Sequence, residues 1–581
     1  MKLTRFILVL LLSLACAAPL CAQKVPVVEK TLSNGMKLLL VERHDDPTIA
    51  GGWVAHVGSA NERPGITGIA HLFEHMMFKG TPTIGTKDAK RDVEIIAEQE
   101  RVREDMRREE AKMRAMWRRG EIDDLLKPES RTERYKDLEK KFKDLDTEQK
   151  KILVKNEFDR IYTTGGGSGM NAFTSTDMTG YYITVPANKL ELWMWMESER
   201  LLRPVFREFY AERDVVFEER RMRTEATPLG RLEESFESLF WESHPYGWPT
   251  VGWPSDIPAI SKAQADEFYA IYYAPQNITA ILVGDFKAAD AERLAEKFFG
   301  RIPRGKHEAP DVVTLEIKQA GEKRLNGEGD TNPSLDIMWH TPAFGHKDNY
   351  PLQVLAQILN GRTGRLYKNL VLGAQVASSV QAGLGARKWA GGFGVDGEVK
   401  DGRTHAELEE AIYAELEKLK KDEVPAEELQ KVKNNFAASE YRRLSGSMAI
   451  LSQLMRTDGL GRWQEINEAG PKLQAVTAAD VKRVANTYLT KENRAVATYS
   501  RKGGGSKPAG EFPGITADQQ AFVNKLRAAL QAETDVAKLK KSLTELIAKL
   551  ATDAGKANPM FRVQRALLEQ RVAELEKGGA K

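Results

Sequence analysis

One local pattern occurs twice in the sequence and decides the fold. Residues 261–283 read SKAQADEFYAIYYAPQNITAILV, and residues 477–497, which start 216 positions later, read TAADVKRVANTYLTKENRAVA. In each copy a Ser or Thr stands three residues before a Gln or Asp, which is typical of a helix N-terminus, and an apolar run typical of a strand follows a short turn. The repeat predicts two related α/β domains. The alternative is that such units recur by chance.

The rest of the chain fits a mixed α+β class. Residues 36–42 and 49–55 predict strands, whereas many later segments show helical spacing of apolar residues. We expect an N-terminal domain over residues 28–305, a C-terminal domain over 310–502, a Gly-rich linker over 503–514 and a helical tail over 515–581.

The N-terminal domain contains an unusually charged stretch, residues 88–157. Its apolar residues recur at helical intervals in two runs, which Gly120 to Pro128 separate. We expect two long helices that form an inserted hairpin, with the charged residues on a solvated face. The apolar positions are Ile95, Val102, Met106, Met113, Trp117, Tyr135, Leu138, Phe142, Leu145 and Ile152.

The overall composition excludes some classes of protein. The chain has 581 residues, of which 41% are hydrophobic, so it is too apolar to be disordered and too long for one ordinary domain. Its 86 Lys and Arg against 83 Asp and Glu give a net charge of +3, which gives no electrostatic reason to expect nucleic-acid binding.

The N-terminus has the pattern of a secretory signal peptide. Lys2 and Arg5 precede an apolar run over residues 6–15, and small residues end at Ala22. The run is too short to span a membrane. Cleavage after Ala22 would also remove both cysteines, Cys16 and Cys21, so we expect a disulfide-free protein in a bacterial periplasm. The alternative is a lipid anchor on Cys16.

The candidate metal-binding and catalytic residues lie in the sequence His71-Leu72-Phe73-Glu74-His75. On a helix, residues four apart share a face, so the two imidazoles can reach one cation with Glu74 beside them. This donor set suits zinc, which also needs a third protein ligand and an open position for water. The alternative for either histidine is a packed core residue.

These residues extend into a longer resemblance. Residues 57–81 (VGSANERPGITGIAHLFEHMMFKGT), 171–175 (NAFTS) with Tyr181 and Tyr182, and 212–220 (ERDVVFEER) occur in this order. The pattern closely resembles the inverted-zinc-motif peptidases of the insulinase and pitrilysin family, peptidase family M16. The resemblance covers about residues 28–500.

The resemblance implies a role for each matching residue. His71, His75 and Glu219 match three ligands of one zinc ion, with Glu218 as the alternative to Glu219, and Glu74 matches the general base. Glu212 matches a second carboxylate that supports the metal site. The segment Asn171, Ala172, Phe173 and Thr174 resembles the edge strand to which such peptidases add a peptide substrate.

One feature of the family is missing. Active members carry an arginine and a tyrosine seven residues apart in a C-terminal domain, and the matching positions here are Val371 and Ser378. The family forms a clam shell of four domains, so the resemblance implies a heterodimer with a related subunit that supplies the pair. If Arg362 or Tyr367 fills the role, a homodimer is possible.

The resemblance therefore implies a zinc-dependent endopeptidase that cleaves peptides or unfolded segments. A second hypothesis is a non-catalytic scaffold or assembly subunit with the same fold. A third is a structural zinc site, against which Glu74 beside a three-ligand site argues, because structural sites usually have four protein ligands.

Overall fold

The computed structural model describes residues 24–125, 127–502, 523, 525–527, 529–531, 533–551 and 559–578. The predicted signal peptide, both cysteines and the whole of the predicted linker lie outside the described residues. Within the described part of the chain, no helix is both long and apolar enough to cross a membrane.

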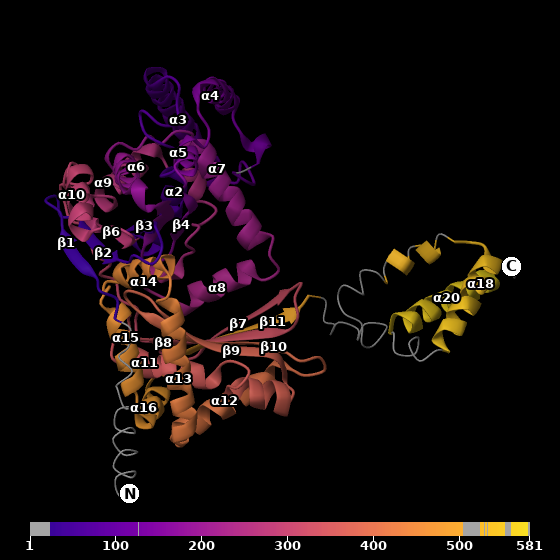
Figure 1. Cartoon of the computed structure of the whole chain (residues 1–581). Coiled ribbons are helices and arrows are strands. Elements are labelled where there is room, and N and C mark those ends of the chain that lie inside the picture. The colour runs from indigo at the N-terminus through magenta and orange to yellow at the C-terminus, as the bar shows by residue number, and fades with distance from the viewer. Residues whose placement is uncertain are drawn as a thin grey trace, which may run out of the picture. The chain divides into compact units, whose positions relative to one another are not determined.

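The N-terminal half is built on a six-stranded sheet (Figure 1). The strand order is β1-β2-β6-β3-β5-β4, in which β2 and β6 are parallel and the other neighbours antiparallel. The predicted strands at 36–42 and 49–55 are confirmed as β2 and β3. The strands are β1 Val28–Thr31, β2 Lys37–Glu42, β3 Thr48–Ala55, β4 Ser168–Thr174, β5 Thr179–Pro186 and β6 Ile278–Gly284.

The helices of this half bury one face of the sheet. Side chains of alternate strand residues, such as Leu38, Leu40 and Trp53, share a buried cluster with apolar residues of the helices, as the two-residue period of a strand requires. These helices are α2 Ile69–Met76, α5 Glu157–Thr164, α6 Leu190–Leu202, α7 Phe209–Arg220, α9 Lys262–Tyr272 and α10 Ala288–Phe298.

The C-terminal half has a five-stranded sheet in the order β7-β11-β8-β10-β9. Apolar residues of α11, α12, α13 and α16 pack on it in a second buried cluster. The elements are β7 Lys323–Gly329, β8 Ser334–Thr341, α11 Asn349–Leu359, η8 Tyr367–Gly373, β9 Ala377–Ala386, β10 Gly391–Val399, α12 His405–Lys421, α13 Ala426–Arg443, α15 Glu465–Ala475, α16 Ala478–Tyr488 and β11 Arg494–Arg501.

The repeated pattern has the predicted structure in both halves. Ser261 and Thr477 each accept a hydrogen bond from the backbone of the residue three positions on, which completes a capping box at the start of α9 and of α16. The turn after each helix leads into β6 and β11 respectively. The two halves are therefore structural repeats.

The halves exchange one helix each. Helix α14 (Ser447–Gly459) of the C-terminal half packs on the outer face of the first sheet, where Leu451 and Leu454 share a cluster with Leu39 and Ile281. Helix α8 (Gly230–Phe240) of the N-terminal half packs beside β7, and its Phe236 joins a cluster with residues of the second sheet. Each half completes the core of the other, and residues up to Ser500 form one compact unit.

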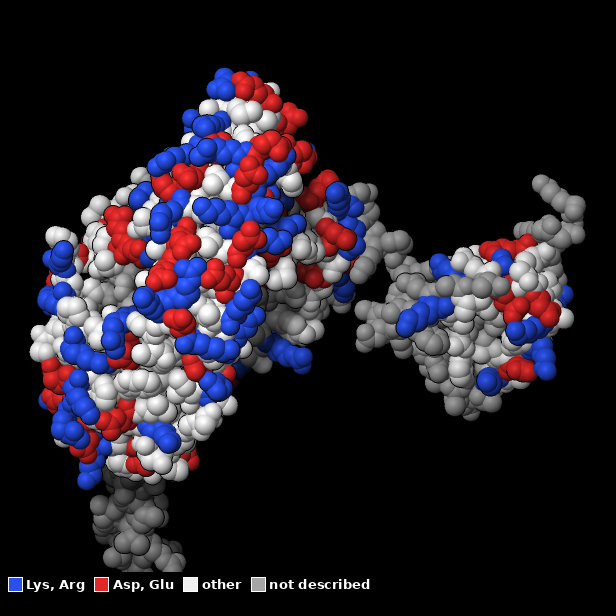
Figure 2. All heavy atoms as spheres, turned by 90° about the horizontal axis from the view of Figure 1, so that it is seen from above, with Lys and Arg blue, Asp and Glu red and all other residues white. Residues whose placement is uncertain are grey.

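The inserted hairpin is present. Helices α3 (Ala89–Arg118) and α4 (Glu133–Ile152) pack against each other through the predicted apolar stripe. Seen from the hairpin side, acidic and basic side chains are interspersed over the surface (Figure 2). The expectation of a solvated face is wrong for part of the stretch, because Asp92, Arg103 and Gln149 are buried.

The chain after Ser500 forms a second unit. Its described residues are largely helical, as predicted, and include α18 (Val536–Leu550) and α20 (Pro559–Gly578). The two helices pack together through a leucine-rich stripe that includes Leu539, Leu546 and Leu568.

Candidate metal centre

Helix α2 presents the histidine pair. It begins after Gly68, whose φ of 91° lies in the left-handed region that glycine adopts without strain. The buried carboxylate of Glu62 accepts hydrogen bonds from the backbone nitrogens of Gly68 (2.9 Å) and Ala70 (2.8 Å). These bonds satisfy two free donors at the helix N-terminus and fix the direction of α2.

Helix α7 supplies the third donor. The Glu219 Oε2 atom lies 3.6 Å from His71 Nε2 and 3.4 Å from His75 Nε2. Ligand atoms bound tetrahedrally to zinc at its usual bond lengths lie about 3.3 Å apart. Both distances from Glu219 are close to this spacing, and the three residues offer donor atoms that all lie within 4.8 Å of one another. Among the described residues they are the one such group of His, Cys, Asp or Glu.

The second Glu219 oxygen is already occupied. Glu219 Oε1 pairs with Arg223 at 2.8 Å, one turn further along the chain. Arg223 belongs to the π-helical segment Arg221–Glu225 that follows α7 directly, and such segments are frequent at functional sites. This pairing leaves only Oε2 to face the histidines, so Glu219 is arranged to bind through one oxygen.

The alternative ligand Glu218 points elsewhere. Its side chain is 59% exposed and pairs with Arg221 at 2.8 Å. Because adjacent helical residues differ by about 100° around the axis, Glu218 and Glu219 cannot face the same point. The geometry favours Glu219.

Glu212 lies behind His75. Its Oε1 atom is 2.9 Å from His75 Nδ1, and its Oε2 atom pairs with Lys79 at 2.6 Å. Burial would raise the pKa of Glu212, but the hydrogen bond with His75 and the contact with Lys79 outweigh it and lower the pKa to about 2. A carboxylate that stays ionised here fixes the His75 ring so that Nε2 faces the other two donors, as in carboxylate–histidine–metal sites.

The two histidines differ in their surroundings. Burial, with the neighbouring His75 and Arg223, lowers the pKa of His71 to about 3, so its imidazole is neutral and ready to bind a cation. Burial lowers the pKa of His75 as well, but Glu212 and Glu219 outweigh it and raise the pKa. A metal must therefore displace a proton from His75 at low pH. His71 Nδ1 is buried and has no hydrogen-bond partner among the described residues.

Glu74 is placed as a proton acceptor. Burial raises its pKa, and Thr174 Oγ1 on β4 donates a hydrogen bond to Glu74 Oε2 at 2.7 Å. A carboxylate with a raised pKa is a better base at neutral pH than an exposed one. The hydrogen bond leaves Oε1 available and links the base to the strand that we predicted to bind substrate.

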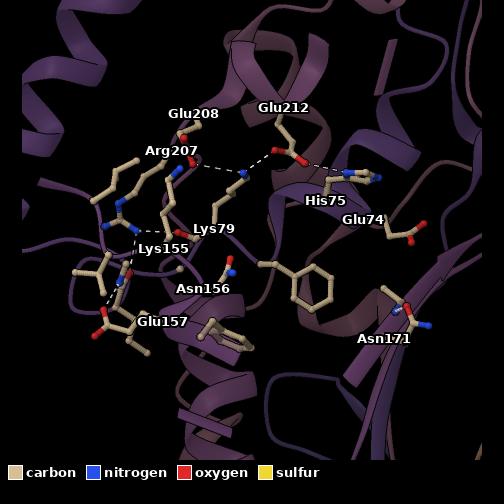
Figure 3. Close-up of a pocket in the computed structure, with 18 residues that line it drawn as sticks. Glu74, His75, Lys79, Lys155, Asn156, Glu157, Asn171, Arg207, Glu208 and Glu212 are labelled. Atoms are coloured by element: carbon tan, nitrogen blue, oxygen red, sulfur yellow. Dashed lines mark hydrogen bonds and ion pairs between the residues drawn. The ribbon is translucent and has the colours of Figure 1, made fainter. Parts of the chain in front are cut away.

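The predicted substrate strand is an edge strand. β4 contains Asn171 to Thr174 and is the last strand of its sheet, so one side of its backbone has no neighbouring strand among the described residues. Asn171 and Ala172 line a cavity of about 520 Å³, together with Glu74 and His75 (Figure 3). Residues 153–158, at the base of the inserted hairpin, line it as well.

Lys79 and Arg223 are two residues of the site that the sequence analysis did not single out. Both are four residues beyond a candidate ligand, so the helical period was a signal that could have found them. Lys79 contacts Glu212 and Arg223 contacts Glu219, and each therefore holds a carboxylate of α7 in place.

The corresponding region of the C-terminal half has lost these donors. Helix α11, which matches α2 in the repeat, reads NYPLQVLAQIL and contains no histidine or acidic residue. At the repeat offset of 216, Glu212 corresponds to Glu428 and Glu219 to Asn435. Glu428 pairs with Arg365 at 2.7 Å instead of orienting a histidine. Ser378, where the family has its tyrosine, bonds to Glu398.

Family models match both halves of the chain. Residues 37–101 match the model described as "Insulinase (Peptidase family M16)". Residues 259–436 match the model described as "Peptidase M16 inactive domain". The first match contains the histidine pair, and the second contains α11 and Glu428.

Curated relatives are similar over most of their length. The chain is 29% identical over 467 residues to "Zinc protease PqqE" of Helicobacter pylori, covering 79% of this chain and 89% of that protein. It is 24% identical over 483 residues to "Uncharacterized zinc protease YmxG" of Bacillus subtilis, covering 81% of this chain and 98% of that protein.

Solved structures share the fold. The crystal structure of a protease from Helicobacter pylori matches with a TM-score of 0.67 at 24% identity, covering 82% of this chain and 100% of that chain. The periplasmic protease PqqL from Escherichia coli matches with a TM-score of 0.60 at 16% identity, covering 87% of this chain but 50% of that chain.

Proposed function

Because this chain belongs to peptidase family M16, we propose that it is a zinc-dependent endopeptidase that cleaves peptides or unfolded segments of polypeptide. One observation carries the proposal: the donor atoms of His71, His75 and Glu219 converge beside Glu74, at the end of a cavity that an edge strand lines. A site that only bound a metal would not need Glu74, a carboxylate outside the set of three donors.

The residues present fit one zinc ion per chain. His71 and His75 would bind it through Nε2 and Glu219 through Oε2, which leaves a fourth position open. When bound, zinc lowers the pKa of its water and polarises the scissile carbonyl. The His75–Glu212–Lys79 chain orients one ligand and keeps Glu212 ionised.

Glu74 would be the general base. It accepts a proton from the attacking water and passes it to the leaving amine, for which its raised pKa is suited. Thr174 keeps the carboxylate turned toward the cavity through its hydrogen bond. The hydrogen bond thereby fixes the position of the general base relative to β4, the proposed substrate strand.

The substrate would bind as an additional strand beside β4. The free edge of β4 offers backbone donors and acceptors that pair with any extended peptide, whatever its sequence. This mode favours unfolded or flexible segments, because a folded protein has few extended stretches free to pair.

A related M16 subunit would complete the active enzyme. The chain matches half of PqqL, and a structure titled as the first half of that protease is also similar, at a TM-score of 0.59. With Val371 and Ser378 where the family has an arginine and a tyrosine, a heterodimer is preferred over a homodimer. Co-expression with a related two-domain subunit and size-exclusion chromatography test this.

The N-terminal pattern supports export to the periplasm. Lys2, Arg5 and the apolar run over residues 6–15 match a signal peptide that ends at Ala22, whereas anchoring through Cys16 would retain the protein at a membrane. N-terminal sequencing of the protein from a periplasmic fraction distinguishes the two outcomes.

Cleavage of a quenched peptide library tests the proposed function. The chain is assayed alone and mixed with a related subunit, with Glu74→Gln as the control. We expect hydrolysis that disappears in the Glu74→Gln protein, although this protein still contains zinc. Zinc without hydrolysis in every preparation would instead support the scaffold hypothesis.

A further inference from the structure

We propose that the inserted hairpin α3–α4 supports the metal centre, because its contacts fix the positions of α2 and α7 relative to each other. Asp92 and Glu100 of the hairpin, with Arg207 and Tyr210 at the start of α7, are then positioning residues for the ligands. The inference rests on the proposed function, since it concerns the same site.

Arg207 joins three segments of the chain. Its guanidinium is 2% exposed and pairs with Asp92 of α3 at 2.5 Å. The same group donates hydrogen bonds to the carbonyl oxygens of Lys79 (3.0 Å), Thr81 (2.6 Å) and Ile84 (2.9 Å), in the loop after α2. Because Arg207 itself lies two residues before α7, one side chain connects the hairpin, the exit of α2 and the entry of α7.

Both helices of the hairpin support this contact. Asp92 is fully buried, and Gln149 of α4 donates to its second oxygen at 2.9 Å. Gln99 of α3 in turn donates to Gln149 at 3.2 Å. A buried ion pair needs such additional hydrogen bonds, because removing charges from water is costly. Polar side chains from both helices at the base of the hairpin therefore hold Arg207 in place.

Tyr210 forms a second anchor. Its hydroxyl donates to Glu100 Oε1 of α3 at 2.6 Å. The guanidinium groups of Arg103 and Arg213 both lie over its ring, 4.9 Å and 5.0 Å from the ring centre. Tyr210 precedes Glu212 by two residues on α7. Its contacts with the hairpin therefore fix how α7 is rotated about its own axis, and this rotation points Glu212 at His75.

A continuous chain of contacts then reaches the histidine. Arg207 fixes the backbone of Lys79, Lys79 pairs with Glu212 at 2.6 Å, and Glu212 contacts His75 Nδ1 at 2.9 Å. Figure 3 shows this series from Arg207 to His75 along one wall of the cavity. A hairpin that served only as a surface appendage would not require a buried ion pair at this point.

Two matched tyrosine variants test the proposal. Tyr210→Phe removes the hydroxyl bonded to Glu100. Tyr135→Phe removes a similar hydroxyl, which donates to Glu110 at 3.2 Å but lies wholly within the hairpin. The zinc dissociation constant of each full-length protein is measured by competition with a chromogenic chelator, and the melting temperature is measured with and without zinc.

The expected result is selective loss of metal affinity. Tyr210→Phe should weaken zinc binding by about threefold to tenfold, a fraction of the effect of losing one hydrogen bond to a charged group, because the lost bond acts on the donors only through α7. Tyr135→Phe should change zinc binding less than twofold. Equal affinities for Tyr210→Phe and wild type, or equal losses in both variants, would overturn the proposal. Absence of zinc binding by the wild type would instead contradict the proposed function.

A shortened hairpin provides an independent test. Replacing residues 112–131 by a short turn keeps Asp92, Glu100 and Gln149 and should leave zinc affinity within twofold of wild type. Asp92→Asn in the full chain should weaken zinc binding by at least about threefold to tenfold, as Tyr210→Phe does, because it leaves the buried Arg207 without its charged partner. A shortened protein that folds but binds zinc as weakly as Asp92→Asn would overturn the assignment to the hairpin base.

Discussion

The two halves of the molecule share one structural detail and differ in their chemistry. In the N-terminal half, Asn277 donates to the carbonyl oxygens of His56 and Tyr272. In the C-terminal half, Asn493 donates to those of His340 and Tyr488. The same side chain thus ties the helix to the neighbouring strand at equivalent places, 216 residues apart.

The difference lies on the helices that face the site. The donors of α2 and α7 have no equivalents on α11 and α13, where Glu428 binds Arg365 and Asn435 replaces Glu219. The buried positions of α7 and α13 nevertheless match, as Val216 and Val432 illustrate. The comparison shows that the same caps and apolar core positions maintain the fold in both halves, whereas a few polar side chains on the helices determine the chemistry.

The largest expected effect comes from removing a ligand. Glu219→Gln should weaken zinc binding by more than about 100-fold, because it replaces the one negatively charged donor by a neutral amide. This loss exceeds the one expected for an outer-shell residue. The matched change in the other half, Asn435→Ala, should have no effect on zinc affinity. Chelator competition measures both, and similar losses in the two variants would contradict the asymmetry of the halves.

The next effect separates two glutamates at equivalent positions. Glu212→Gln should weaken zinc binding by about 10- to 100-fold, because the carboxylate that orients His75 is lost. Glu428→Gln should leave zinc affinity unchanged and lower the free energy of unfolding by about 1 kcal/mol, since it breaks only the pair with Arg365. A change in zinc affinity with Glu428→Gln would refute this distinction.

The shared asparagines should respond alike. Asn277→Ala and Asn493→Ala each remove two hydrogen bonds from a side-chain amide to backbone carbonyls, so each should lower the free energy of unfolding by about 2 kcal/mol. Urea denaturation followed by circular dichroism measures the loss. If only one variant is destabilised, the two repeats do not depend on the same contact.

The smallest effect concerns how the stability of the second sheet depends on pH. Asp336 on β8 faces Asp396 on β10, where the first sheet has Gly52 facing Tyr182. Burial, with Asp396 nearby, raises the pKa of Asp336 to about 6. The folded state therefore binds the proton more tightly than the unfolded state, and the stabilisation present below about pH 4 is lost as the pH rises to about 6.

Asp336→Asn removes this dependence. At pH 7 the substitution should raise the free energy of unfolding by about 1 kcal/mol, less than the full pKa shift implies because the side chain is partly exposed. At pH 4 it should have little effect. Urea denaturation at the two pH values measures the difference, and equal effects at both would show that the Asp336 carboxyl is not perturbed.

Much of the fold could be predicted from local patterns. The capping residues Ser261 and Thr477, the strands β2 and β3 and the stripe of the hairpin are all encoded within short windows. The exchange of α8 and α14 could not be predicted, because an apolar helix face indicates that it is buried but not against which sheet.

The candidate site, too, could be predicted only in part. The spacing of His71, Glu74 and His75 within one helical turn could be read directly from the sequence, and the resemblance to the family supplied Glu219 and Glu212. The role of Arg207 could not be predicted. A charged residue among many others predicts a solvated side chain, and only the three-dimensional contacts show that it is buried with Asp92.

Zinc content per chain tests the central claim most directly. The purified full-length protein, incubated with zinc and dialysed, is analysed by inductively coupled plasma mass spectrometry beside the His75→Ala variant. The structure predicts one zinc ion per wild-type chain and none in the variant, because the N-terminal half alone has the three donors among the described residues. No zinc in the wild type, or the same content in both proteins, would contradict the assignment.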